Sequence, residues 1–514
     1  MAKFSFGNIH LGVGTQPEPA QPQKPGAPFH LLVLGDFTGR ANRGVNDSGP
    51  ALAKLKPRVI DRDNFEDVMA ALDVKLQLTM PGADAAVLEL EFKELDDFHP
   101  DRLYRNLEMF QALRSLRRRL DNPKTFADAA AEVRQWAGAR APQAPAPPPQ
   151  KKVSQEEAGD LLSQMLEEST DDVIAPQPII PRDWNAYIAK MVDPYLIPGT
   201  DPKQPEFVKL VDEATSQQMG QVLHHPQFQT VEAAWRSLFF LIKRLETDER
   251  LKVFFLDISQ EELSADLLGV EDLSTCGLYK LLVEKTVGTP GAIPWAAFLG
   301  GFVFEHQVEQ LELLGRLAQV AQAATAPFIA SATSAAVGCA DVVQTPDPDD
   351  WNDTPPAEVS EAWQALRSLP AAQYLGLTFP RFLLRLPYGK NDDPCDEFAY
   401  EEHDGGSHHL RYLWGSGALA AGCLLGQMYT QAGWNLQPGM IQELDNLPLH
   451  VYKEDGDSEI KACGEVVLSE RAAENILKVG LMPVLTLKHQ DRIRLPSFRS
   501  VSTSSDPLSG RWGG

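Results

Sequence analysis

The sequence predicts a mixed α/β fold, because strand-like segments alternate with segments of helical periodicity along its 514 residues. Continuous apolar runs at residues 29–34, 251–258 and 295–304 are typical of buried strands. After residue 97, apolar side chains recur at helical spacing, at Leu103, Leu107, Phe110, Leu113, Leu116 and Leu120. Because a single hydrophobic core stops growing well below this length, we expect more than one domain.

The stretch at residues 374–390, YLGLTFPRFLLRLPYGK, carries two arginines inside an apolar pattern. Pro380 interrupts the alternation of the first half, which predicts a buried strand, a kink and a turn. A buried guanidinium is costly unless its donors meet carboxylates or carbonyls. Carboxylates that follow soon after are the candidate partners of Arg381 and Arg385: Asp392, Asp393, Asp396, Glu397, Glu401 and Glu402.

These charges predict an architectural network, because buried ion pairs of this kind are usually structural. A catalytic use of the same residues is the alternative. The side chains expected to form the structural ion pairs are Arg381, Arg385, Glu401 and Glu402.

Composition excludes several classes of protein. A net charge of −24 and a pI near 4.9 argue against nucleic acid as the principal partner. Five cysteines are scattered without a CxxC pair, which fits a reducing compartment and gives no zinc pattern. No apolar run is long enough to cross a bilayer, so we expect a soluble cytoplasmic protein without direct membrane insertion.

Residues 4–13, FSFGNIHLGV, form a short extended pattern followed by a spacer rich in proline and glutamine up to Pro28. A free strand on a flexible tether can complete the sheet edge of another subunit, because unpaired backbone groups there accept a further strand. A disordered tail is the alternative interpretation. Next, the strand at residues 29–34 ends in the glycine turn GDFTGR, but no Gly-Lys-Ser/Thr follows, which argues against nucleotide binding.

Residues 137–150, AGARAPQAPAPPPQ, predict a semi-rigid linker, since alanine and proline at this density cannot build a core. Beyond it, Ser154 and Glu157 form a capping box that opens a short amphipathic helix. A helix of this kind beside a flexible linker is suited to docking in a groove. Packing on the chain's own core is the alternative. The apolar stripe of this helix includes Leu161, Leu162, Met165 and Leu166.

No catalytic, cofactor-binding or metal-binding residue is predicted. The most metal-like cluster spans residues 395–409, but it lacks the HExxH order and any fixed helical spacing. A metal-dependent hydrolase built on this cluster is the alternative. His224 and His225 are adjacent and so diverge on a helix, and residues 415–417, GSG, lack the complete GxSxG elbow.

Several of these phrases resemble one known family. The order and spacing of residues 375–389, of Phe398, Glu401 and Glu402, and of residues 412–415 are similar to the large contractile-sheath subunit of type VI secretion systems, the TssC/VipB-like proteins. The phrase QVLHHPQFQTVEAAWRSL at residues 221–238 supports the same resemblance.

Residues 29–120 resemble the small sheath subunit, the TssB/VipA-like proteins, on the phrases LGDF, IDRDNF and DFHPD. In that family the two subunits are separate chains that intertwine, so the resemblance implies a fusion whose two domains share mixed β-sheets flanked by helices. The implied domains are an arm at 1–28, a small-subunit-like domain at 29–136, a linker with the amphipathic helix at 137–180, and a large-subunit-like domain at 181–514.

The resemblance implies a structural subunit of a contractile sheath without cofactor or catalytic residue. Its implied partners are other sheath subunits, an inner tube protein, baseplate components and a ClpV-like AAA+ ATPase that recognises the helix carrying Leu161, Leu162, Met165 and Leu166. The chain stops after RLPSFRSVSTSSDPLSGRWGG, where the large subunit normally continues, so the resemblance implies that the domain at 181–514 lacks the usual C-terminal region. A sheath-like adaptor that does not polymerise is therefore the alternative function.

Overall fold

The computed structural model describes residues 4–9, 23, 26–80, 87–138, 204–403, 408–454, 457–504 and 506–512. The proline-rich linker and the stripe of Leu161, Leu162, Met165 and Leu166 lie outside these residues. The chain forms two compact units. The first comprises Met1–Leu78, Glu89–Leu103 and Gly220–Gly514, and the second comprises Thr79–Leu88 and Tyr104–Met219.

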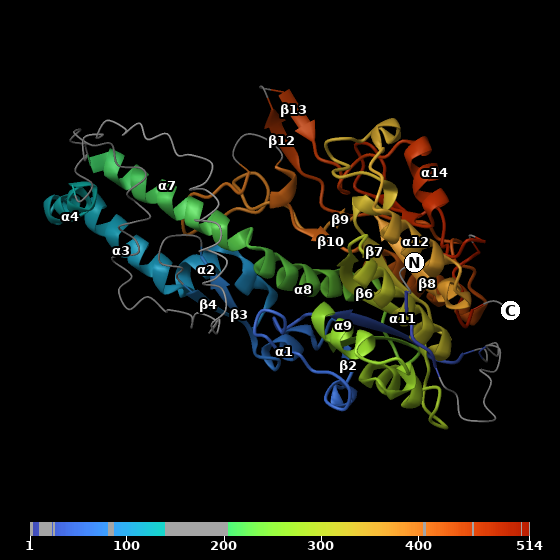
Figure 1. Ribbon diagram of the computed structural model, residues 1–514. Helices are drawn as coiled ribbons and strands as arrows, with labels where there is room; N and C mark the ends of the chain where they lie inside the picture. Colours follow the sequence, from blue (N-terminus) through green and yellow to red (C-terminus); the bar gives the residue numbers. More distant parts are fainter. Residues whose placement is uncertain are drawn as a thin grey trace, which may run out of the picture. The chain divides into compact units, whose positions relative to one another are not determined.

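A seven-stranded sheet organises the first unit (Figure 1). Five of its pairings are parallel, and only β2 at one edge runs antiparallel to its neighbour. The strands stand in the order β14 (Met482–Pro483), β8 (Leu375–Phe379), β7 (Phe328–Ala332), β6 (Trp295–Phe304), β1 (Phe29–Gly35), β5 (Leu251–Asp257) and β2 (Arg58–Ile60).

Strand β1 is an interior strand, with β5 on one side and β6 on the other. Leu32 stands opposite Phe254 of β5 and Phe298 of β6, and all seven residues of β1 are buried. This burial explains the unbroken apolar run, because a parallel strand covered on both faces has no solvent side to alternate with. Since β1 precedes the proline-rich stretch and both neighbours follow it, the predicted intertwined α/β fold is confirmed.

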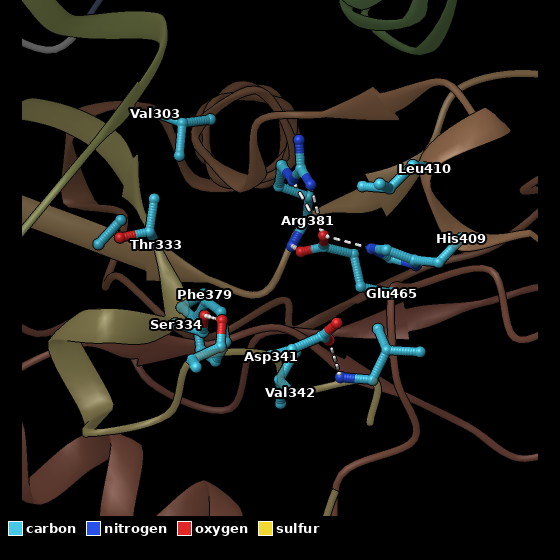
Figure 2. Close-up of a pocket in the computed structure, with 13 residues that line it drawn as sticks. Val303, Thr333, Ser334, Asp341, Val342, Phe379, Arg381, His409, Leu410 and Glu465 are labelled. Carbon is cyan, nitrogen blue, oxygen red and sulfur yellow. Dashed lines mark hydrogen bonds and ion pairs between the residues drawn. The ribbon is translucent and has the colours of Figure 1, made fainter. Parts of the chain in front are cut away.

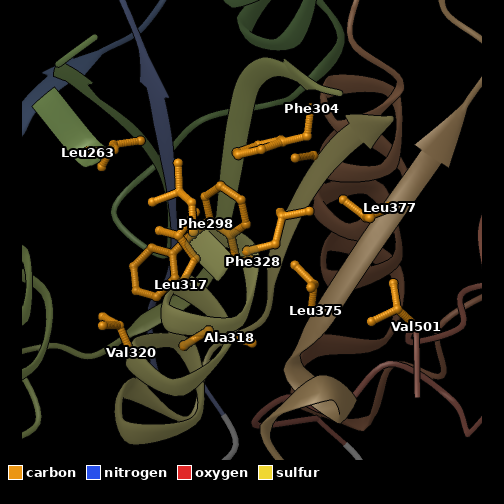
Figure 3. Close-up of a cluster of buried hydrophobic side chains, with 14 of the residues drawn as sticks. Leu263, Phe298, Phe304, Leu317, Ala318, Val320, Phe328, Leu375, Leu377 and Val501 are labelled. Atoms are coloured by element: carbon orange, nitrogen blue, oxygen red, sulfur yellow. The ribbon is translucent and has the colours of Figure 1, made fainter. Parts of the chain in front are cut away.

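Helices cover both faces of this sheet. Helix α11 (Val308–Ala324) and helix α13 (Gly417–Ala432) each contact β6, β7 and β8. The side chain of Phe298 belongs to the same core as Leu317 of α11 (Figure 3), whereas the adjacent Leu299 packs at Gly422 of α13. Because successive side chains of a strand point to opposite faces, the two helices lie on opposite sides of the sheet.

Further helices of the first unit pack against α11 and α13 or lie between the strands along the chain. Helix α8 contacts α13, and α9 and α12 contact α11. The longer ones are α8 (Pro226–Arg244), α9 (Gln260–Leu268), α12 (Ala357–Arg367) and α14 (Glu470–Val479). The short ones are η1 (Leu52–Lys54), α1 (Phe65–Ala70), η2 (Leu95–Phe98), η4 (Leu273–Thr275), α10 (Gly277–Tyr279), η5 (Lys280–Glu284), η6 (Ser334–Val337), η7 (Pro348–Asp350), η8 (Pro370–Tyr374), η9 (His409–Arg411) and η10 (Gly433–Asn435).

Smaller sheets complete the strand inventory of the described residues. Strand β9 (Phe382–Leu383) pairs with β10 (Trp414–Gly415), and β12 (Val451–Glu454) pairs with β13 (Asp457–Ile460). Strands β11 (Glu443–Leu444), β16 (Ile493–Arg494) and β15 (Leu485–Thr486) form a three-stranded sheet, and β3 (Val74–Thr79) and β4 (Val87–Phe92) form a two-stranded sheet.

Apart from the ends of two strands, the described part of the second unit is mainly helical. It holds α3 (Glu108–Asp121), α4 (Phe126–Gly138) and most of α7 (Gln204–Leu223), and the division between the units falls within α2 (Pro100–Asn106) and α7. Arg117 of α3 is 2.6 Å from Asp212 of α7, and the ring of Phe126 packs edge-to-face against Phe207. No helix of the described residues is long and apolar enough to cross a membrane.

Candidate functional site

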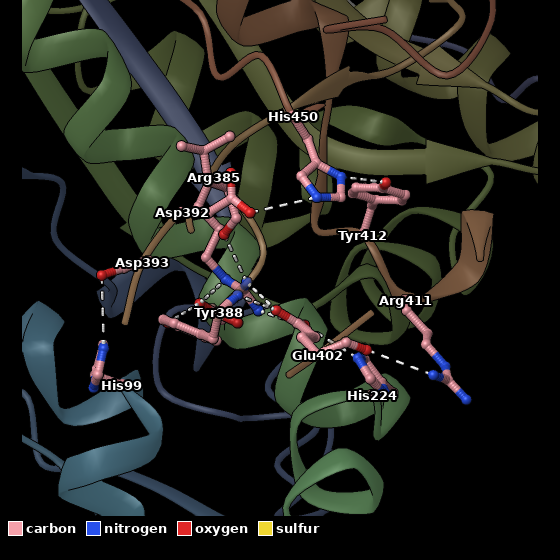
Figure 4. Close-up of polar contacts among 12 residues, drawn as sticks. His99, His224, Arg385, Tyr388, Asp392, Asp393, Glu402, Arg411, Tyr412 and His450 are labelled. Atoms are coloured by element: carbon pink, nitrogen blue, oxygen red, sulfur yellow. Dashed lines mark hydrogen bonds and ion pairs between the residues drawn. The ribbon is translucent and has the colours of Figure 1, made fainter. Parts of the chain in front are cut away.

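The loop that follows β9 brings one buried arginine between two buried carboxylates. The guanidinium of Arg385 donates from Nε to Glu232 Oε1 at 2.9 Å (Figure 4). Its Nη1 and Nη2 donate to the two carboxylate oxygens of Glu402 at 2.7 and 3.1 Å. This fork-to-fork arrangement is the strong geometry for an arginine and a carboxylate. The side chains of both glutamates have no exposed surface, so the arginine supplies the charge that makes their burial possible.

A second arginine and an aromatic ring complete this buried network. Arg236 of α8 donates from Nε to Glu232 Oε1 at 2.7 Å and from Nη2 to the hydroxyl of Tyr388 at 2.9 Å. The guanidinium carbon of Arg385 lies 4.0 Å from the centre of the Tyr388 ring. Two arginines therefore balance two glutamates, and the network ties α8 to the loops on either side of residue 388.

His224 supplies a further contact at the end of α7. Its Nε2 is 3.1 Å from Glu402 Oε1, and the backbone N–H of Tyr388 donates to Glu402 Oε2 at 2.8 Å. Burial alone would raise the pKa of Glu402, but Arg385 and His224 hold it well below its ordinary value. Burial also raises the pKa of Tyr388, so its hydroxyl stays protonated and available to the network.

The predicted ion-pair residues separate into different environments. Arg385 and Glu402 meet directly, whereas Arg381 pairs with Glu465 at 2.6 Å, a residue that was not among the expected partners. Glu401 accepts the backbone N–H of Lys390 at 3.1 Å instead of meeting an arginine in the described part of the chain. The fold determines these choices, because partners 84 or 153 residues apart are brought together by strand order and not by local spacing.

The remaining acidic candidates contact other groups. Asp392 lies 3.5 Å from His450, and Asp393 lies 3.7 Å from His99 (Figure 4). The backbone N–H groups of Asp396 and Glu397 donate to the carboxylate of Asp101 at 2.9 and 3.0 Å. These contacts therefore tie the loop to His450, His99 and Asp101.

Glu232 and Arg236 belong to the buried network but were not predicted from the sequence. Both stand in the phrase VEAAWRSL, four residues apart on α8, where the helix is otherwise apolar on its buried face. An ion pair at this spacing in a buried helix face was the available signal. His225, the residue before α8, caps this helix by accepting the N–H of Gln227 at 3.3 Å.

Arg381 lines a pocket of about 260 Å³ at the carboxyl ends of β6, β7 and β8 (Figure 2). Its backbone N–H and guanidinium both contact Glu465, and His409 Nε2 is 3.3 Å from the same carboxylate. Burial alone would raise the pKa of Glu465, but Arg381 and His409 lower it to about 2. The exposed side chain of Leu410 stands at the rim. Arg381 and His409 thus both contact Glu465, whereas Asp341, which also lines the pocket, accepts the backbone N–H of Val343 at 2.8 Å.

The residues of the metal-like cluster at 395–409 take part in different contacts: Glu402 with Arg385, Asp396 with Asp101, and His409 with Glu465. Burial raises the pKa of Cys395 to about 12, which disfavours the thiolate that binds metals. Among the residues that the structure describes, which exclude 404–407, no group of three or more His, Cys, Asp or Glu side chains is arranged to hold a metal ion.

Ser416, in the GSG phrase at residues 415–417, caps α13 and shares a hydrogen bond of 2.9 Å with Ser331.

The turn after β1 joins the segment before the linker to the segment after it. The N–H groups of Phe37 and Thr38 donate to Asp257 Oδ1 at 2.9 and 3.1 Å. Arg40 donates to both oxygens of Glu262 at 2.6 and 2.7 Å. Burial raises the pKa of Asp257 to about 6. This turn is therefore held by carboxylates at the carboxyl ends of β5 and at the start of α9.

Comparisons with known proteins match both parts of the chain. A family model described as VipB, EvpB/VC_A0108, tail sheath N-terminal domain, matches residues 205–502. A second model, described as type VI secretion system, VipA, VC_A0107 or Hcp2, matches residues 15–136. The type VI secretion system sheath protein TssC1 of Pseudomonas aeruginosa is 32% identical over 290 residues. That alignment covers 55% of this chain and 58% of the relative, which is less than two thirds of the relative's length.

Proposed function

We propose, since the chain belongs to the VipB tail-sheath family, that it is a structural subunit of the cytoplasmic contractile sheath of a type VI secretion system. In this proposal the parts resembling the small and the large subunit act as one fused chain. The observation that carries the proposal is the presence of both family matches, at residues 15–136 and 205–502, in a single sequence. A shared sheet in which β1 stands between β5 and β6 supports it.

The proposed role is mechanical and requires no catalytic residue. A subunit that transmits force needs parts that do not separate under load. Strand β1 hydrogen-bonds along both of its edges, so a pull on it is resisted by two parallel ladders at once. The network of Arg385, Glu232 and Glu402 adds buried contacts that lose much stability when one partner is removed.

The proposed partners follow from this role. Other sheath subunits would form the lattice, and the inner tube protein and baseplate components would contact it. The stripe of Leu161, Leu162, Met165 and Leu166 remains a proposed recognition site for a ClpV-like AAA+ ATPase. Arg381, Arg385, Glu401 and Glu402 remain proposed structural residues, of which Arg385 and Glu402 pair directly.

Electron microscopy of the purified full chain tests the proposal. We expect tubes or stacked rings, either from the chain alone or after addition of the inner tube protein. Discrete particles under both conditions, at concentrations where folding is intact by circular dichroism, would contradict a sheath subunit and favour the non-polymerising adaptor. Expression in cells that lack other sheath genes would then separate a self-sufficient subunit from one that needs a partner chain.

A further inference from the structure

The segment Phe4–Ile9 lies against its own chain. The structure assigns no strand to it, in contrast to the extended strand expected at residues 4–13, and residues 10–13 lie outside the described part. Asn8 forms one parallel bridge with Asp272. Its N–H donates to the carbonyl of Glu271, and its carbonyl accepts the N–H of Leu273, each at 2.8 Å. Main-chain hydrogen bonds of this kind hold an added peptide without regard to its side chains.

Two side chains of α11 contact the carbonyl groups of the segment. Gln319 Nε2 donates to the carbonyls of Phe6 and Gly7 at 2.6 and 2.9 Å. Arg316 Nε donates to the carbonyl of Ser5 at 3.2 Å. Arg316 is only 3% exposed, and its Nη1 donates to the carbonyl of Leu267 at 2.8 Å. The arginine is therefore held in position by a carbonyl outside the segment, and its Nε donates to the segment.

The contacts also select side chains. Phe6 packs on Gly315 of α11, where a Cβ atom would overlap the phenyl ring. Gly7 has a φ of +68°, a conformation that side-chain-bearing residues rarely adopt. Ser5 donates through its hydroxyl to Glu271 Oε2 at 3.0 Å. The surface thus fits a serine, an aromatic residue and a glycine in this order.

We infer that the surface formed by Glu271, Leu273, Gly315, Arg316 and Gln319, here termed the α11 seat, is a peptide-binding site. Its ligand is an extended segment with the order Ser-Phe-Gly, and the occupant is the chain's own segment Phe4–Ile9. A cavity of about 460 Å³ borders the bound segment beside Leu369, Pro370 and Ala371.

The segment Phe4–Ile9 can leave the α11 seat without unfolding the rest of the chain. Nineteen residues, 10–28, stand between Ile9 and β1 and can span on the order of 60 Å when extended. The segment can therefore leave the α11 seat while β1 stays in the sheet. Departure would leave Nε of Arg316 and Nε2 of Gln319 without the carbonyl groups that they now contact, so the seat favours re-occupation. This inference is independent of the proposed sheath function.

A chain that begins at residue 10 and a fluorescent peptide of residues 1–14 test the inference. We expect saturable binding of one peptide per chain by fluorescence anisotropy. Replacement Phe6→Ala or Gly7→Val in the peptide should weaken binding at least about tenfold, as should Gln319→Ala in the chain. The matched control is Glu309→Ala, which alters an exposed side chain of the same helix and should leave binding unchanged.

Absence of binding by the folded shortened chain, or equal binding of the Phe6→Ala peptide, would overturn the inference. If the shortened chain does not fold, the full chain with a protease site at residues 17–22 replaces it. After folding and cleavage, we expect the released segment to co-elute with the body and to dissociate faster in the Phe6→Ala variant. If the cleaved segments of the unmodified chain and of the Phe6→Ala variant were retained equally, this experiment would overturn the inference.

Discussion

The indole Nε1 of Trp235 donates a hydrogen bond of 2.7 Å to the backbone carbonyl of Phe37, across 198 residues of sequence. The ring of Phe37 also meets the indole edge-to-face, with centroids 5.4 Å apart. Both side chains are at most 1% exposed. Because Phe37 precedes the proline-rich linker and Trp235 follows it, this contact joins the two family-matched parts in the core of the first unit.

Replacement Trp235→Phe should lower the free energy of unfolding by about 1–3 kcal/mol, because the buried carbonyl of Phe37 loses its donor. Urea unfolding monitored by circular dichroism measures the change. Trp351→Phe is the matched control. Trp351 donates to the carbonyl of Thr345 at 2.8 Å, only six residues away and in a half-buried loop, so we expect a smaller loss. Equal losses would show that the long-range contact adds nothing specific.

Replacement Arg385→Met should destabilise the first unit by about 3–5 kcal/mol, because it leaves the carboxylates of Glu232 and Glu402 buried without their shared arginine. The midpoint of urea unfolding measures this effect. Arg492→Met is the control, since its pair with Glu443 is 3.3 Å long and both side chains are partly exposed. Exposed pairs contribute about 0–1 kcal/mol. A small effect of Arg385→Met would contradict an architectural role for the network.

The raised pKa of Asp257 predicts that this residue stabilises the fold at low pH, opposite to the usual loss of stability in acid. Burial raises its pKa from 3.8 to about 6, so the folded state binds this proton more tightly than the unfolded state. Its contribution to stability is fully present below about pH 4 and is lost as the pH rises through about 6. Replacement Asp257→Asn should remove this decline. Between pH 4 and pH 7, the free energy of unfolding of the variant should therefore rise by roughly 1–3 kcal/mol relative to that of the unmodified chain.

Urea midpoints measured at half-unit intervals of pH test this difference. Asp248→Asn is the control, because hydrogen bonds from the N–H groups of Leu251 and Arg250 lower the pKa of the exposed Asp248. That carboxylate contributes stability above its unfolded value, which is lost as the pH falls, so the control should change the profile only at the acid end. Parallel profiles for Asp257→Asn and the unmodified chain would contradict the prediction.

Cleavage within residues 141–150, at an introduced protease site, should not separate the chain into two parts. Strand β1 pairs with β5 and β6 on either side, so release of the first fragment would break two ladders and expose a fully buried strand. We expect the two fragments to co-elute in gel filtration and to part only in denaturant. Elution of the first fragment by itself under native conditions would contradict the shared sheet.

Helix periodicity located α3 but not its start. The sequence predicted one long helix after residue 97, whereas Leu107 is extended and separates α2 from α3. Gln111 then donates through its side chain to the carbonyls of Arg105 and Asn106 at 3.3 and 3.2 Å, groups that a continuous helix would have paired through the backbone. A stripe of leucines continues across such a break, so periodicity alone does not reveal it.

The sequence by itself determined the α/β class, the buried character of β1 and the membership of the sheath family, because apolar runs, helical stripes and long phrases are local properties of the chain. Only the tertiary structure decided that Arg381 meets Glu465, that Arg385 lies between Glu232 and Glu402, and that Phe4–Ile9 rests on α11. The physical reason is distance along the chain. Partners separated by tens to hundreds of residues depend on which strands become neighbours, and no local spacing records that order.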